Sequence, residues 1–170
     1  MRLYSTKIPL ISSEIIKSLG ETEAIALVDQ NEAELDVQAV LKEYLRLERE
    51  VTDKAKDVLQ TRGLPYEQFG RVKKALAAER NVQFGEDGLE WMTNQIIESF
   101  LNSPHVEEVF VDDASLRRTM TQILRKHMQV DTDLDVEVRR RIKNLEEGTA
   151  TWEVEYNKAL EQIKRNRGLE

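Results

Sequence analysis

The stretch Ile8–Leu19, IPLISSEIIKSL, is matched further along the chain by Leu89–Phe100, LEWMTNQIIESF. In both stretches apolar residues recur every three or four positions, which is the spacing of one face of an α-helix. The two stretches share this pattern more than identical residues, although a pair of isoleucines occupies the same place in each. We therefore predict that the chain presents one architecture twice, each time opening with an amphipathic helix.

The match continues in the same order along the chain. The step Leu27-Val28-Asp29 aligns with Phe110-Val111-Asp112, and helical stripes follow both steps. One stripe consists of Val37, Val40, Leu41 and Leu45, and the other of Met120, Ile123, Leu124 and Met128. Because four successive segments match with one small gap, we predict two tandem units, residues 1–81 and 82–170, packed together and able to form one compact domain.

Each unit is predicted to hold three to four helices. The last helix is expected at about 65–80 in the first unit and at about 151–165 in the second. Asn31 with Glu34 is typical of a capping box before the second helix. In the second unit, 131–133 (Asp-Thr-Asp) predicts a turn between the second and third helices. The first unit has no helix breaker from Leu45 to Asp53, so there the two helices could be continuous.

The connectors after the first helices are rich in β-prone residues. They are Ala24–Val28 and Val106–Val111, and they could pair as one short strand ladder or remain extended linkers. The predicted fold class is therefore mainly α, with one short β pairing between the connectors left open.

Composition excludes several classes of protein. The net charge is -7, so the overall field does not attract nucleic acid or anionic membranes. The chain has no cysteine, which rules out disulfides, thiolate catalysis and cysteine metal sites. No continuous apolar stretch predicts a signal peptide or a membrane span, so we expect a cytoplasmic protein.

Three segments resemble a bacterial family known as domain of unknown function 507. The first is the opening, with Met1-Arg2-Leu3, Lys7-Ile8, Ile11-Ser12 and Ile15-Ile16, and the second is the Val28-Asp29 step before a helix. The third is the closing stretch 147–158, EGTATWEVEYNK, in which a Gly, a Trp and a Tyr precede a charged helix. On this resemblance the chain is read as two tandem copies of the family domain. The family implies no activity, cofactor or site residues.

No pattern of a catalytic, metal or cofactor site is found. The segment 131–135 (Asp-Thr-Asp-Leu-Asp) matches the first ligands of a calcium-binding loop, but Val136 stands where glycine is required. His105 is expected at the surface and His127 at a helix edge, and no nucleophile elbow or phosphate-binding glycine loop is present. The expectation is no metal and no cofactor.

Two features could contact a partner. Arg139, Arg140 and Arg141 with Lys143 form the one concentrated basic run, on a helix that would follow another across a short turn, as in a helix-turn-helix. Trp152 and Tyr156 lie four residues apart on one helical face. They are expected in the core of the second unit, with the alternative that they anchor a partner.

The sequence leaves the function unknown. By elimination we favour a non-catalytic cytoplasmic protein-interaction or scaffold module that binds a protein partner or itself. The alternative is a nucleic-acid-binding regulator that uses the basic helix around Arg139–Arg141, and the third reading is an enzyme of unrecognised type. The membrane is not an expected partner.

Overall fold

The computed structural model describes residues 2–167, with residues 130–132 described by their backbone alone. Besides three short 3-10 turns, this part of the chain holds six α-helices and one pair of short strands, which confirms the mainly α prediction. In order, the α-helices and strands are α1 (Ile8–Glu21), β1 (Ile25–Leu27), α2 (Gln30–Arg62), α3 (Phe69–Glu79), α4 (Gly88–Asn102), β2 (Val106–Val109), α5 (Asp113–Arg141) and α6 (Ala150–Asn166).

The elements follow the order helix, strand, long helix, short helix, and this order occurs twice. Strands β1 and β2 pair antiparallel, with Ile25 opposite Val109 and Ala26 opposite Glu108. The two connectors therefore form the short ladder that the sequence left open, and this ladder ties the two halves of the chain together.

Helix α2 is one continuous helix, as the absence of a breaker allowed. It begins at the cap residue Asp29, whose carboxylate accepts a hydrogen bond from the Glu32 amide at 3.1 Å. The capping box predicted at Asn31 is therefore wrong, because Asn31 already lies inside the helix. Helix α2 ends at Gly63, whose φ of 60° is the left-handed conformation that closes many helices.

Helix α5 is also continuous, so the turn predicted at 131–133 is wrong. None of these residues breaks a helix, and an aspartate inside a helix costs less than about 1 kcal/mol relative to alanine. The apolar stripe explains the continuity, because Leu116, Met120, Leu124 and Met128 are followed in phase by Leu134, Val138 and Ile142, all buried. The helix is capped by Asp112, which accepts from the Ser115 amide at 2.8 Å.

The main core lies where both halves meet. Helix α1 packs against α2 and α5, and α4 packs against the same two helices. Its buried residues include Ile11, Ile15 and Leu41 from the first half and Met92, Ile96 and Leu124 from the second. Each half thus supplies two helices to one shared core.

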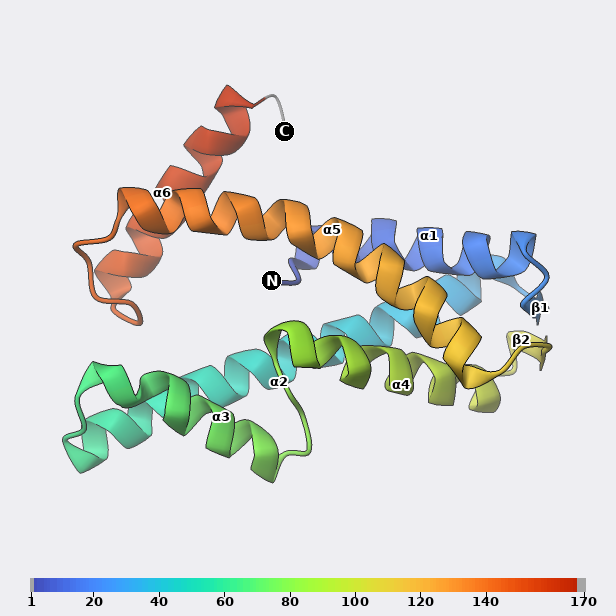
Figure 1. The fold of residues 1–170 in the computed structure, drawn as a ribbon, viewed down its shortest axis with the longest axis horizontal. Helices are drawn as coiled ribbons and strands as arrows, with labels where there is room; N and C mark the ends of the chain where they lie inside the picture. The colour runs from blue at the N-terminus through green and yellow to red at the C-terminus, as the bar shows by residue number, and fades with distance from the viewer. Residues whose placement is uncertain (1, 168–170) are drawn as a thin grey trace.

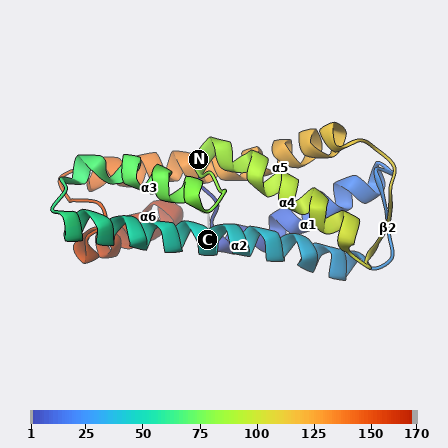
Figure 2. The ribbon, with the colours of Figure 1, turned by 90° about the horizontal axis from the view of Figure 1, so that it is seen from below.

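Beyond the main core, α2 and α5 extend into two arms (Figure 1). The first arm is the part of α2 after Val51 together with α3, and the second is the part of α5 after Met128 together with α6. The second arm has its own small core, formed by Leu134, Val138, Ile142, Trp152, Tyr156 and Ile163. Figure 2 shows α2 running along the whole length of the molecule, from the strand pair to the tip of the first arm.

Candidate functional site

A cleft of ≈ 1010 Å³ lies between the two arms. Helix α3 lines it with Phe69, Lys73, Lys74 and Ala78, and the second arm lines it with residues of α5, α6 and the loop between them. The N-terminal residues Arg2 and Tyr4 close one side. The cleft is therefore built from segments that are far apart in the sequence.

One wall of the cleft is organised around Arg139. Its guanidinium donates to both carboxylate oxygens of Glu147, at 2.7 and 3.0 Å, and to Asp135 at 2.8 Å. It also lies over the Trp152 ring, 5.2 Å from the centroid. The hydrogen bonds to Glu147 raise the pKa of Arg139, and the same bonds lower the pKa of Glu147. The result is a preorganised surface on which the arginine is held in one place.

Two tyrosines continue this network. The Tyr156 hydroxyl donates to Asp135 at 2.5 Å, and it hydrogen-bonds the Tyr4 hydroxyl at 2.9 Å. Burial, together with the neighbouring carboxylate, raises the pKa of Tyr156, so this phenol stays protonated. Arg2 lies over the rings of both tyrosines, at 5.2 and 5.7 Å. This network fixes the N-terminal segment against the second arm.

The tips of the two arms touch through polar side chains. Lys56 of α2 pairs with Glu153 of α6 at 3.1 Å, and its aliphatic chain lies against Gly148. Tyr66 lies in a short turn just before α3, and burial together with the nearby Glu147 carboxylate raises the pKa of its phenol. These tip contacts involve partly exposed groups, which are worth little individually in water. The arms extend from the shared core, and the polar contacts between their tips add little stability.

Part of the basic run and the Trp152–Tyr156 pair both line the cleft. Arg139, Trp152 and Tyr156 line it, but Trp152 and Tyr156 are 9% and 4% exposed and stack on each other at 4.9 Å between centroids. Both residues therefore lie in the core of the second arm, with part of their surface in the cleft wall.

Of the basic run, Arg139 lines the cleft and the other three residues do not. Arg140 and Lys143 are exposed, and Arg141 pairs with Glu137 at 3.5 Å. Because α5 is one helix, the helix-turn-helix arrangement proposed for this run is not formed. Nucleic-acid binding by Arg139, Arg140, Arg141 and Lys143 stays a prediction.

The two histidines lie away from the cleft lining. His127 hydrogen-bonds Glu14 at 2.5 Å and so joins α5 to α1. His105 precedes β2, and its carbonyl accepts from the Val28 amide at 2.8 Å. The segment 131–135, which matched only the first ligands of a calcium-binding loop, lies within α5, and Asp135 pairs with Arg139 and Tyr156. Among the described residues, no cluster of three or more His, Asp or Glu could hold a metal ion.

Sequence reasoning missed the residues that join the arms. Tyr66, Lys56 and Glu153 carry no motif, and their contacts depend on how two distant helices are placed. Glu147 opens the stretch 147–158 that resembles the family, but its pairing with Arg139 follows only from the loop that turns back after α5. The sequence signal that pointed to this part of the molecule was the four-residue spacing of Trp152 and Tyr156.

A family model described as a protein of unknown function, DUF507, matches residues 1–169. The chain belongs to this family. One DUF507 unit spans both halves, so the reading of two tandem copies of the family domain is wrong. No curated protein matches the chain. Within the described part of the DUF507 chain, no helix is long and apolar enough to cross a membrane.

Proposed function

We propose that this DUF507 protein is a non-catalytic cytoplasmic protein-interaction module that holds a segment of a partner protein between its two arms. The observation that carries the proposal is the cleft, because its walls combine aromatic rings with charges of both signs. Trp, Tyr and Arg are the residues that dominate binding at protein interfaces.

The size and chemistry of the cleft favour a peptide segment over a small metabolite. Its volume of ≈ 1010 Å³ is at the upper end of ligand pockets, which span roughly 300–1,000 Å³. Its lining holds five Lys or Arg and five Asp or Glu, so no single charge is selected. Peptide segments offer apolar, cationic and anionic groups together, and such a lining can pair with each of them.

The repeated element order supports an internal duplication as the origin of the two arms. A duplication within the DUF507 unit would have produced the two arms, each made from the end of a long helix and one short helix. Two arms placed on a shared core form a cleft that neither half would have alone.

Two alanines of α3 provide a matched test. Ala78 lines the cleft and Ala75 does not, and both are exposed. Tagged wild-type, Ala78→Trp and Ala75→Trp proteins are expressed in native cells, cross-linked mildly and captured, and the recovered proteins are quantified by mass spectrometry. Circular dichroism checks that both variants remain folded.

The proposal predicts that at least one protein recovered with the wild type and with Ala75→Trp is lost with Ala78→Trp. Recovery of the same proteins by all three would show that the cleft is not the binding site. Turnover of a metabolite by the purified wild type, abolished by Ala78→Trp, would replace the proposal with an enzyme.

A further inference from the structure

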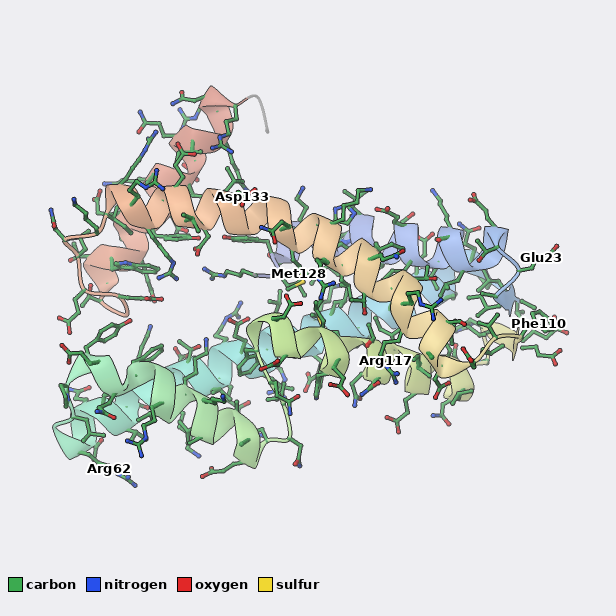
Figure 3. All side chains as sticks on the ribbon, viewed as in Figure 1. Glu23, Arg62, Phe110, Arg117, Met128 and Asp133 are labelled. Carbon is green, nitrogen blue, oxygen red and sulfur yellow. The ribbon has the colours of Figure 1, made fainter. Side chains whose placement is uncertain are left out.

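A second surface lies at the opposite end of the molecule from the arm tips, around the strand pair. Val28 follows β1 directly and is 66% exposed, and Phe110 follows β2 directly and is 57% exposed. Figure 3 shows Phe110 at this end, close to Glu23. Leu101, in the last turn of α4, is 68% exposed. The antiparallel register places Val28 beside His105 and Phe110 beside Ala24, so these two residues flank opposite ends of the ladder. Large apolar side chains exposed together at one end of a molecule are typical of an interaction site, here one that an extended segment could span.

The backbone holds two of these side chains in place. The Val28 amide donates to the His105 carbonyl at 2.8 Å, and the Phe110 amide donates to the Ala24 carbonyl at 2.9 Å. The ladder thus continues beyond the strands on both sides. A partner could bind these side chains without first ordering a loop, which lowers the entropy cost of binding.

The surrounding charge has one sign. Residues 21–36 and 98–113 together hold eleven Asp and Glu and no Lys or Arg. The remainder of the chain holds all 25 Lys and Arg and only the other 21 of the 32 acidic residues. Glu23, Glu107, Glu108 and Asp113 of this end are exposed. We call Val28, Leu101 and Phe110, with the acidic residues of these two segments, the strand-end face.

The charge selects among possible occupants. A second copy would bring eleven acidic residues against eleven in a symmetric pairing, and like charges across an interface cost binding energy. Nucleic acid and anionic membranes are repelled for the same reason. A divalent cation is not favoured, because no metal-binding cluster is found among the described residues.

We propose that the strand-end face docks an extended protein segment in which apolar side chains alternate with lysines or arginines. One apolar side chain of the segment packs on Val28 and another on Phe110, and the cations between them meet the surrounding acidic residues. Complementary charge of this kind steers association and depends on ionic strength. This surface is separate from the cleft, so it would serve a second partner or a second segment of one partner.

Three synthetic peptides test the proposal by fluorescence anisotropy with the full-length chain. The first alternates Lys and Leu, the second Lys and Ser, and the third Glu and Leu, all of one length. Val28→Ser and Phe110→Ser remove the apolar anchor points. The matched control is Val154→Ser, since Val154 of α6 is 52% exposed but lies on the second arm. Glu107→Gln/Glu108→Gln tests the rim.

We expect the Lys-Leu peptide to bind at least tenfold more tightly than the other two. Val28→Ser and Phe110→Ser should each weaken it at least fivefold, Val154→Ser less than twofold, and the rim variant should reduce the dependence on salt. The proposal would be overturned if the Lys-Leu and Lys-Ser peptides bound equally well. It would also be overturned if Val154→Ser weakened the Lys-Leu peptide as much as Val28→Ser and Phe110→Ser do. So would a dimeric wild type that becomes monomeric with Phe110→Ser, because the occupant would then be a second copy. None of these outcomes depends on Ala78, so the cleft proposal stands or falls separately.

Discussion

Ser12 and Thr93 occupy equivalent places in α1 and α4, and both side chains are fully buried. The Thr93 hydroxyl donates to the Leu89 carbonyl at 2.9 Å, whereas the Ser12 hydroxyl has no hydrogen-bond partner among the described residues. A buried hydroxyl without a partner lowers stability, and alanine is also the better helix former. Ser12→Ala should therefore stabilise the protein by about 0.5–1 kcal/mol, and Thr93→Val should destabilise it by a similar amount. Urea unfolding of both variants measures this, and a loss of stability in Ser12→Ala would contradict the assignment.

Gly88 opens α4 where the chain passes close to Tyr44. A Cβ at this position would lie 2.3 Å from the Tyr44 oxygen and 2.9 Å from the Gln83 carbonyl oxygen. Tyr44 is 1% exposed and packs against Phe84 and Trp91, so it cannot move aside freely.

Gly88→Ala should accordingly lower the free energy of unfolding by about 1–3 kcal/mol through overpacking. The matched control is Gly70→Ala, because Gly70 lies in α3 and nothing approaches its Cβ position within 4 Å. There alanine should stabilise by up to about 1 kcal/mol through helix propensity. We expect the melting temperature to fall in Gly88→Ala and to rise in Gly70→Ala. An unchanged melting temperature in Gly88→Ala would refute the close approach to Tyr44.

At the scale of elements, the continuity of α5 is open to a direct test. Asp133 lies inside the helix, where proline removes a hydrogen bond and clashes with the preceding turn. Asp133→Pro should cost about 3 kcal/mol or separate the melting of the second arm from that of the core. If a turn ended at Asp133, proline there would be tolerated. Denaturant unfolding followed by far-ultraviolet circular dichroism distinguishes the two cases.

Helices α1 and α5 are joined by a titratable contact. The pKa of Glu14 is lowered from 4.5, mainly by its hydrogen bond with His127 and further by Lys126, while partial burial opposes the change. A carboxylate with a lowered pKa in the folded state stabilises the protein above its unfolded pKa, and this contribution is lost as the pH falls through the folded value.

Glu14→Gln should therefore be less stable than the wild type near neutral pH, and the difference should shrink as the pH falls below 4.5. Unfolding free energies of both proteins measured across the acid range provide the comparison. A difference that stays constant with pH, or grows toward acid, would show that the carboxylate is not the source.

The sequence patterns predict where helices and strands occur better than they predict where each helix begins and ends. Helical spacing located the helices of the described residues, although it divided α5 into two, and the β-prone connectors left open the strand pairing that the structure forms. The turn at 131–133 was wrong because local polarity was given more weight than the apolar stripe that continues through it. Arg139, Trp152 and Tyr156 were found as candidates because their types and spacing are unusual. Their arrangement around Glu147 and Asp135 depends on tertiary packing that no local pattern contains.

At the scale of the molecule, the shared core predicts that the halves depend on each other. Helices α1 and α4 each pack on both long helices, and the strand ladder needs one strand from each half. Residues 1–81 and 82–170, expressed separately, should each lack a cooperative thermal transition, and co-expression should yield a folded complex. A cooperative transition in residues 1–81 alone would show two independent domains.

The proposed function places a partner segment between the arms, in contact with both. The most direct measurement places a photo-cross-linking residue in native cells at Ala78 on α3, at Asn157 on α6, or at Ala75 as the control outside the cleft; the first two positions line the cleft from opposite arms. We expect adducts from Ala78 and Asn157 with the same stretch of the same partner protein, and little or none from Ala75. Adducts from one arm only, or equal adducts from Ala75, would contradict it.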